Sequence, residues 1–197
     1  MNINSQSNIN FSAKFLNNAV IKKFDREAKQ FLPHKVSFIE LEPQNCADVE
    51  AVDKIFDNWG KADLIYKIKS SFEIKHFYPA ESFASKFYGI TTQKSEFDEL
   101  KPEQIMGIVE VAPETDKEIY LEFLQVKPEL KSGSTGRGYK NIGSAILNSL
   151  KEMFDEIRLC SLKKSAKFYE INGFEPKAKG SFKEHVWERV PSDVIEY

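Results

Sequence analysis

The sequence has little of what marks several large protein classes. Among 197 residues there are two cysteines, Cys46 and Cys160, too few for a disulfide framework or a cysteine-based metal cluster. No run approaches the roughly 20 apolar residues that a membrane-spanning helix needs. The first residues also lack the basic and then apolar segments of a secretory signal. These absences predict a cytoplasmic location, and we expect both cysteines to be buried as small hydrophobic side chains.

Neither sign of charge dominates. Lysine and arginine contribute 28 residues and aspartate and glutamate 30, so the formal net charge is −2. The strongly basic face that marks a nucleic-acid-binding protein is therefore not expected. With 41% hydrophobic and 29% charged residues, the composition is that of one globular domain. We expect residues 1–30 to form a partly mobile N-terminal arm and residues 31–197 to form the domain.

The first half of the sequence offers two clear elements. Residues 36–42 read as a strand that Pro43 stops, because proline cannot continue a ladder of backbone hydrogen bonds. Apolar residues at helical spacing predict a helix over residues 48–59, and Gly60 stands where such a helix would end. For residues 61–83 helix and strand both remain open.

The second half alternates strands and helices more regularly. Two strands joined by a short turn at residues 113–117 predict an antiparallel hairpin, and a glycine-rich loop before residue 142 opens a helix with apolar residues on one face. The strand 118–126 is apolar on both faces, which is typical of a central strand; we expect Leu121 and Phe123 on one face and Tyr120, Leu124 and Val126 on the other. The pattern predicts strands over 85–92, 105–112, 118–126, 156–161, 174–176 and 184–190 and helices over 142–154 and 163–171.

The loop before residue 142 has a composition suited to an anion. Free N–H groups and the positive end of a helix dipole near Asn141 to Ser144 can hold a phosphate group. The glycines of this segment are not spaced as in a dinucleotide fingerprint, and no Walker motif follows. Many strand–glycine–helix turns bind no ligand, so a purely structural role stays open.

Three segments together resemble the GNAT superfamily of acetyl-CoA-dependent N-acetyltransferases. They are Leu124-Gln-Val-Lys-Pro128, Arg137-Gly-Tyr-Lys-Asn-Ile-Gly-Ser-Ala-Ile-Leu147 and Phe168-Tyr-Glu-Ile-Asn-Gly-Phe174. The resemblance implies an α/β fold: a curved, mostly antiparallel sheet with helices on both faces, splayed near Val126 where the cofactor enters. The stretch between the first two segments is longer than is usual for the family, and Asn141 stands where the first loop glycine would be.

The resemblance also implies roles for individual residues. Tyr169 would protonate the departing CoA thiolate. The backbone of strand 118–126 would bind the pantetheine arm, and the loop and first helical turn would hold the pyrophosphate. The implied cofactor-binding residues are Leu124, Gln125, Val126, Arg137, Gly138, Tyr139, Lys140, Asn141, Ile142, Gly143 and Ser144.

A direct transfer also needs a base to deprotonate the acceptor amine, and we expect it among the carboxylates of the central hairpin. Glu122 is an acid in an otherwise apolar strand, which is costly unless the side chain is paired or faces a ligand. Glu122 is therefore our first choice as base or substrate-orienting group, and Glu110 on the neighbouring strand is the runner-up; a paired structural carboxylate remains the alternative. No metal is expected.

Taken together, the sequence suggests transfer of an acetyl group from acetyl-CoA to a primary amine, either a small molecule or a lysine or N-terminal amine, by direct attack. An alternative is a GNAT-like fold kept as a non-catalytic CoA-binding or protein-interaction module. A third is an effector-like protein whose N-terminal arm binds a partner. The sequence indicates neither a nucleic-acid nor a membrane partner, and it does not indicate the oligomeric state.

Overall fold

The computed structural model describes residues 13–60, 63–79, 85–94, 100–136, 138–177 and 183–190. These residues form one mixed sheet in the strand order β6-β1-β2-β3-β4-β5-β7-β9-β8, with helices on both faces. The strands are β1 Lys14–Asp25, β2 Gln30–Leu41, β3 Lys86–Thr91, β4 Ile105–Pro113, β5 Glu118–Val126, β6 Tyr139–Lys140, β7 Glu156–Ser161, β8 Glu175–Lys177 and β9 Lys183–Glu188. The helices are α1 Cys46–Trp59, α2 Asp63–Phe77, α3 Ile142–Met153 and α4 Ala166–Ile171, with short 3-10 turns at Pro102–Gln104 and Pro128–Leu130.

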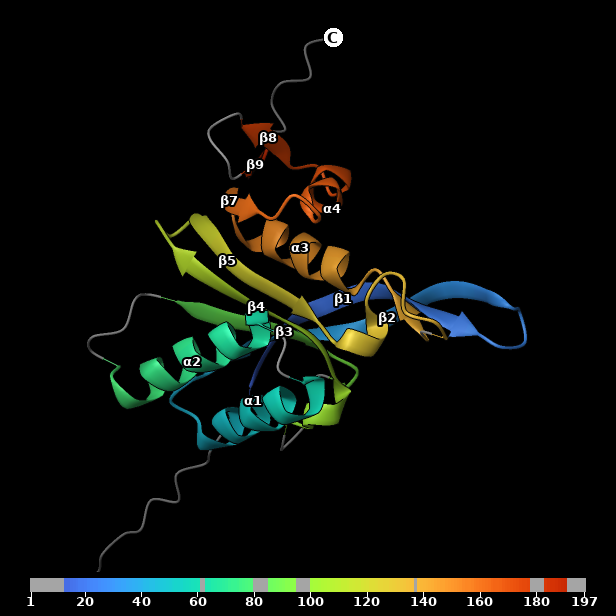
Figure 1. The fold of residues 1–197 in the computed structure, drawn as a ribbon, viewed down its shortest axis with the longest axis horizontal. Coiled ribbons are helices and arrows are strands. Elements are labelled where there is room, and N and C mark those ends of the chain that lie inside the picture. The colour runs from blue at the N-terminus through green and yellow to red at the C-terminus, as the bar shows by residue number, and fades with distance from the viewer. Residues whose placement is uncertain are drawn as a thin grey trace, which may run out of the picture.

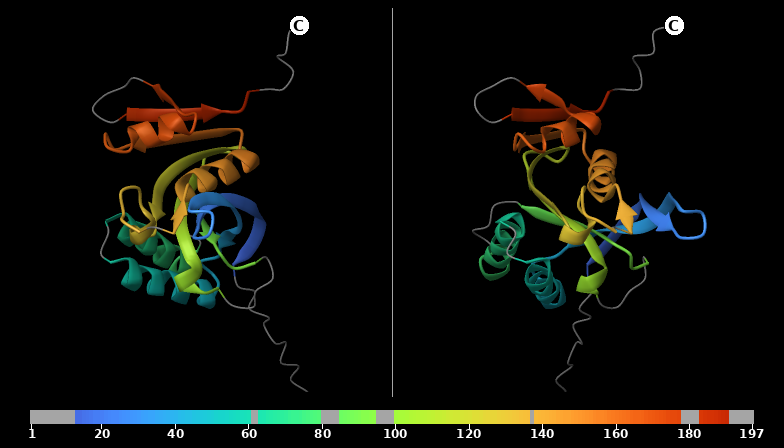
Figure 2. Two further views of the ribbon diagram at one scale, coloured as in Figure 1. Left: turned by 90° about the vertical axis from the view of Figure 1, so that its right-hand side faces the viewer. Right: turned by 45° about the vertical axis from the view of Figure 1, so that its right-hand side comes forward.

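The sheet is covered on its two faces by different helices. Figure 2 shows α1 and α2 on one side and α3 on the other, with β7, β8, β9 and α4 gathered at one end. All neighbouring strands run antiparallel except β5 and β7, which are parallel. The expected fold, a mostly antiparallel sheet flanked by helices on both faces, is confirmed.

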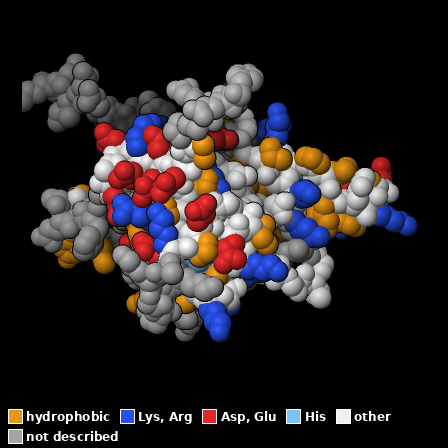
Figure 3. All heavy atoms as spheres, turned by 90° about the horizontal axis from the view of Figure 1, so that it is seen from above, with side chains coloured by type: hydrophobic (Ala, Val, Ile, Leu, Met, Phe, Trp, Pro, Cys, Tyr) orange, Lys and Arg blue, Asp and Glu red, His pale blue; other side chains and the backbone are white. Residues whose placement is uncertain are grey.

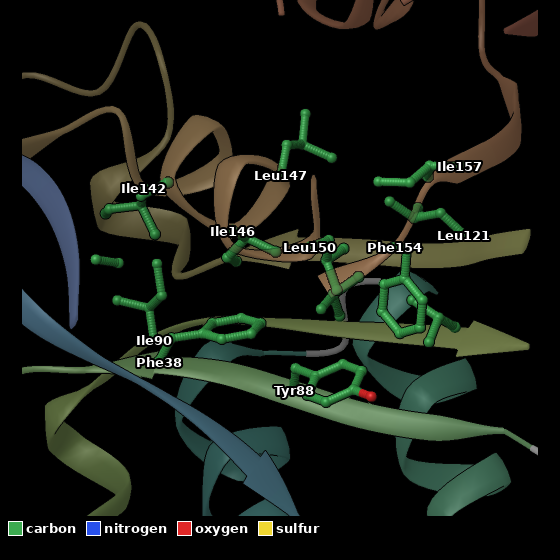
Figure 4. Close-up of a cluster of buried hydrophobic side chains, with 14 of the residues drawn as sticks. Phe38, Tyr88, Ile90, Leu121, Ile142, Ile146, Leu147, Leu150, Phe154 and Ile157 are labelled. Atoms are coloured by element: carbon green, nitrogen blue, oxygen red, sulfur yellow. The ribbon is translucent and has the colours of Figure 1, made fainter. Parts of the chain in front are cut away.

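Each face of the sheet has its own hydrophobic core because strand residues alternate between faces. On the α3 side, Ile146 and Leu150 of the helix pack over Phe38 and Tyr88 of β2 and β3 (Figure 4). On the other side, Ile39, the next residue of β2, is fully buried beneath α1 and α2. The ring of Phe72 in α2 meets that of Phe87 in β3 edge to face, with centroids 4.8 Å apart.

The N-terminal region is part of the sheet. Residues 14–25, which we expected in a partly mobile arm, form β1 and pair along their length with β2 in a long hairpin. This hairpin projects from the rest of the molecule (Figure 1). Residues 1–12 of the expected arm lie outside the described residues.

Two further expectations change with the structure. Residues 63–77, left open between helix and strand, form the helix α2. Cys46 and Cys160, expected to be buried, are both exposed: Cys46 begins α1, and Cys160 lies on the face of β7 away from the buried Ile157 and Leu159. Among the described residues, no helix is long and apolar enough to cross a membrane.

Candidate active site

The central feature of the candidate site is the divergence of β5 and β7. Within the described residues the two strands pair only at Glu118–Tyr120 with Glu156–Arg158, after which they separate. The second half of β5 therefore has a free edge on this side. The N–H of Lys127 donates to the carbonyl of Met106 in β4, so alternation along the strand turns the backbone groups of Leu124 and Val126 toward the free edge.

The side chain of Gln125 helps to fix this end of β5. It is buried, and its Nε2 donates to the carbonyl oxygen of Val126 over 2.6 Å. Of the three residues expected to bind a pantetheine arm through their backbone, Leu124 and Val126 face the free edge, whereas the backbone of Gln125 faces β4.

The first turn of α3 lies beside this edge. A Cβ built on Gly143 would be 3.7 Å from the side chain of Leu124, so the helix begins next to β5. The first helical hydrogen bond runs from the N–H of Ala145 to the carbonyl of Asn141. The N–H groups of Ile142, Gly143 and Ser144 precede it and have no partner inside the helix.

The loop that leads into α3 is anchored to the projecting hairpin. Tyr139 and Lys140 form β6, which pairs with Lys23 and Lys22 of β1. The ammonium of Lys140 lies 3.8 Å from the centroid of the Phe31 ring. Asn141 then takes a left-handed conformation with φ of 64°, which asparagine tolerates better than most residues. Arg137 lies outside the described residues, and a Cβ on Gly138 would meet nothing within 4 Å.

Helix α4 packs against the same turn of α3. The ring of Phe168 is so close to Gly143 that a Cβ there would lie 2.9 Å from its Cζ. Tyr169 follows, is 9% exposed, and packs edge to face on Phe168 and Phe174. Burial raises the pKa of the Tyr169 hydroxyl to about 12, which keeps it protonated at neutral pH.

Glu122 sits at an irregularity in β5. The register shifts so that Glu110 of β4 pairs with Phe123 and Val111 pairs with Leu121, which leaves Glu122 as an extra residue in a β-bulge. The bulge overturns the expected pattern of faces. Leu121 packs with the core on the α3 side, together with Leu124 and Val126, whereas Phe123 packs with the core under α1 and α2.

Glu122 is an exposed residue, but part of its carboxyl is shielded from water. Partial burial raises its pKa above the usual range. Burial raises the pKa of the nearby Tyr120, whose hydroxyl hydrogen-bonds to Cys160 on β7, and the charge of Glu122 adds to this rise. Glu122, Tyr120 and Cys160 thus lie together where β5 and β7 begin to separate.

Glu110, the runner-up in the sequence analysis, is the more unusual carboxylate. It is 3% exposed, and burial raises its pKa to about 7. The side chains of Ser71 in α2 and Ser85 before β3 hydrogen-bond to it, and Glu122 adds electrostatic repulsion. The sequence alone could rank Glu110 only second, because its burial depends on α2, an element that the sequence left undecided.

The sequence matches no protein-family model and no curated protein. Several solved structures are similar in fold. The PaiA N-acetyltransferase of Thermoplasma acidophilum, solved with coenzyme A, is 17% identical with a TM-score of 0.48 over 78% of this chain and 98% of its own. The N-acetyltransferase PseH of Campylobacter jejuni, solved with acetyl coenzyme A, is 17% identical with a TM-score of 0.48 over 78% and 99% of the two chains.

A third similar structure is the spermidine/spermine N-acetyltransferase SpeG of Vibrio cholerae, solved with manganese ions. It is 12% identical, with a TM-score of 0.47 over 78% of this chain and 92% of its own. At these identities and TM-scores the similarities concern the fold alone and assign no activity.

Proposed function

We propose that this protein is an N-acetyltransferase that moves an acetyl group from acetyl-CoA to a primary amine. The observation that carries the proposal is the free edge of β5 at Leu124 and Val126, which lies directly beside the first turn of α3. An extended pantetheine arm could add to this edge as a short strand through backbone hydrogen bonds. Its pyrophosphate would then meet the N–H groups of Ile142, Gly143 and Ser144.

Basic side chains near this turn support the same assignment. The contact of Phe168 with Gly143 brings α4 next to the start of α3. The segment that leads into α4 carries Lys163 and Lys164, and α4 itself carries Lys167; all three are exposed. Cationic side chains at this point would favour the negatively charged pyrophosphate. Because residue 138 is glycine, the loop has no Cβ at this position, and a ligand could approach the loop backbone closely.

The transfer itself needs one proton acceptor and one proton donor. We assign Glu122 to take a proton from the acceptor ammonium, so that the free amine can attack the carbonyl carbon of the thioester. As the new C–N bond forms, the C–S bond breaks and the sulfur leaves as a thiolate. We assign Tyr169 to donate its hydroxyl proton to that thiolate, a role that its protonated state at neutral pH supports.

The test combines binding with turnover. Isothermal titration with CoA and with acetyl-CoA measures the first step, and release of the CoA thiol in the presence of an amine panel measures the second. Tyr169→Phe should lower kcat by 10²-fold or more, as expected for loss of a general acid, while the Kd for CoA stays within a factor of about three. Tyr66→Phe, at an exposed tyrosine of α2, is the matched control and should behave as wild type.

A second candidate is a CoA-binding module without turnover. The close contact of Phe168 with Gly143 favours it, because the ring fills space between α4 and the start of α3. This module would bind CoA in the titration and release no thiol with any amine. Absence of CoA binding would remove both candidates.

A further inference from the structure

The hairpin of β1 and β2 has one face that combines apolar and basic side chains. Ala19 and Ile21 of β1 pack in the core on the α3 side, and strand residues alternate between the two faces of a sheet. The residues between and after them, with their partners in β2 and β6, therefore lie on the opposite face, which we call the hairpin face. Its apolar residues are Val20, Phe24, Phe31 and Pro33, and its basic residues are Lys22, Lys35 and Lys140.

The apolar side chains of the hairpin face are open to solvent. Val20 is 57% exposed and Phe24 is 40% exposed, and Pro33 is exposed as well. The half-buried Phe31 meets Phe24 edge to face, with ring centroids 5.2 Å apart. In Figures 1 and 2 the end of the hairpin projects past the helices. Apolar side chains gathered on a projecting surface mark an interaction site.

The charge of the hairpin is opposite in sign to that of the whole chain. Residues 14–35 contain six basic and two acidic side chains, a net charge of +4, whereas the whole chain carries −2. The hairpin projects at the right of Figure 3 and shows mainly hydrophobic and basic side chains there. The overall composition predicts no membrane partner because it averages this basic hairpin with an acidic remainder.

The two acids of the hairpin do not lie on the hairpin face. Asp25 is on the α3 side of β1, next to the turn, and its Oδ1 accepts from the N–H groups of Glu27 and Ala28. Glu27 lies in the turn itself. Among the described residues of β1, β2 and β6, the hairpin face therefore carries positive charge and no negative charge.

Basic and apolar residues are interleaved on the hairpin face. Lys22 lies between Val20 and Phe24 along β1, and Lys35 is the direct partner of Val20 in β2. A complementary partner presents negative charge and hydrocarbon side by side. The surface of an anionic bilayer does so, because lysine stems can lie along apolar groups while their ammonium groups reach the lipid headgroups.

Two other occupants fit the hairpin face less well. A single-stranded nucleic acid stacks its bases on open aromatic faces, but the ammonium of Lys140 lies over the Phe31 ring, 3.8 Å from its centroid. A second copy related by a twofold axis would set Lys22 and Lys35 of one hairpin face against the same lysines of the other. Like charges would then oppose the contact.

We propose that the hairpin face binds the surface of a membrane that contains anionic lipids. The three lysines would contact the headgroups, and Val20 and Phe24 would enter the boundary between headgroups and acyl chains. The inference goes beyond acetyl transfer and does not depend on it. Val20, Lys22, Phe24 and Lys35 have no part in the transfer proposed above.

Co-sedimentation of the full chain with lipid vesicles tests the proposal. One set of vesicles contains phosphatidylcholine alone, and the other contains about one quarter phosphatidylserine. The protein should sediment with the second set and remain in solution with the first. Raising NaCl from about 0.1 M to about 0.5 M should release most of it, because salt screens the lysines. Equal binding to both sets, or binding to neither, would overturn the proposal.

Two variants separate the basic from the apolar contribution. Lys22→Gln combined with Lys35→Gln should weaken binding to the anionic vesicles at least tenfold, since each lysine near such a surface contributes about fivefold. Phe24→Ser keeps every charge and should weaken binding about threefold or more. Circular dichroism shows whether each variant folds. A folded Phe24→Ser protein that binds as wild type would overturn the proposal, because the partner would then read charge alone.

The matched control removes the same charge elsewhere. Lys101 and Lys117 are exposed and lie outside the hairpin, so Lys101→Gln combined with Lys117→Gln should bind the anionic vesicles as wild type does. If this control weakens binding as much as the Lys22 and Lys35 substitutions do, the overall charge and not the hairpin face binds the vesicles, and the proposal is wrong.

The remaining outcomes identify another occupant or separate the two proposals. Binding to poly-L-glutamate or to a single-stranded oligonucleotide without binding to vesicles would overturn the proposal, and so would a dimer in sedimentation velocity with no vesicle binding. The Kd for CoA should be unchanged in the Lys22 and Lys35 variant. A protein that binds anionic vesicles but not CoA would keep the membrane site and refute the transferase, and the opposite result would do the reverse.

Discussion

The ring of Phe168 lies against the α-carbon of Gly143, and it is this contact that joins α4 to the first turn of α3. A Cβ at position 143 would come within 2.9 Å of Cζ of that ring, closer than real Cβ contacts allow. Glycine is therefore required at this position by helix packing. The same contact keeps Tyr169, the next residue, next to the start of α3.

Gly143→Ala should test this packing. We expect a loss of roughly 1–3 kcal/mol in the free energy of unfolding, the usual cost of overpacking, measured by urea denaturation. Combined with Phe168→Leu, the alanine should cost less than it does alone, because the smaller side chain leaves room. Gly138→Ala is the control, since its Cβ would meet nothing within 4 Å. Additive effects of the two substitutions would contradict the contact.

Asp48 should be a major contributor to stability. Its carboxylate is fully buried and accepts from the N–H of Ala13 over 3.0 Å and from the N–H of Glu42 over 2.8 Å, which ties the start of β1 and the end of β2 to α1. Asp48→Ala leaves two N–H groups without an acceptor and should cost roughly 2–4 kcal/mol.

The control for this prediction is on the same helix. Asp57 is exposed near the end of α1, so Asp57→Ala should change the free energy of unfolding by less than about 0.5 kcal/mol. Asp48→Asn keeps one acceptor oxygen and should fall between the two. Equal midpoints of denaturation for the Asp48 and Asp57 variants would show that the two hydrogen bonds contribute nothing.

Glu110 should make the stability of the protein pH-dependent. Its pKa rises from 4.5 to about 7 on folding, so the folded state holds the proton more tightly than the unfolded state does. The contribution to stability is therefore present at low pH and is lost as the pH rises through this window, by roughly 3 kcal/mol in total. Glu110→Gln should remove this loss. The free energy of unfolding of the variant should therefore fall less between pH 5 and pH 8 than that of the wild type.

Urea denaturation at pH 5 and pH 8 gives the measurement, and the Glu118→Gln variant corrects for the other titrating groups. If the free energies of unfolding of wild type and Glu110→Gln change in parallel between the two pH values, the carboxyl of Glu110 has an ordinary pKa and is not buried.

Cys160 should be dispensable for turnover. It is exposed beside Tyr120 at the point where β5 and β7 separate, so its thiol is a conceivable acetyl carrier. Direct attack by the amine needs no such carrier, and Cys160→Ala should retain kcat within about threefold. Double-reciprocal plots for acetyl-CoA and amine should intersect. Parallel lines together with an inactive Cys160→Ala enzyme would replace direct attack by a covalent acetyl-cysteine route.

The sequence predicts the second half of this fold well because its signals are local. The hairpin of β4 and β5 and the apolar stripe of α3 depend on periodicity over a few residues. The sequence did not predict β1 because few of its side chains are buried: among its residues, Ala19 and Ile21 are the buried ones. The hydrogen bonds from β2 keep β1 extended.

The sequence indicates which backbone segments form the candidate site, but it does not indicate the surroundings of the two carboxylates. A motif can indicate that the loop before Gly143 and strand 118–126 approach a cofactor, but the bulge at Glu122 arises from pairing with β4 and leaves no mark in the sequence. Likewise, the hydrogen-bond partners of Glu110, Ser71 and Ser85, lie far from it in sequence. Contacts of this kind are set by tertiary structure.

The short parallel ladder between β5 and β7 also determines how the molecule comes apart. Strands β7, β9 and β8 are joined to one another by antiparallel hydrogen bonds, while their ladder to β5 within the described residues spans three residue pairs. The C-terminal strands can therefore open as one cooperative unit while the central strands stay closed. In hydrogen exchange, deuterium should therefore enter the amides of β7, β8 and β9 before it enters those of β3 and β4. Any motion that moves β5 and β7 further apart would begin at their short parallel ladder.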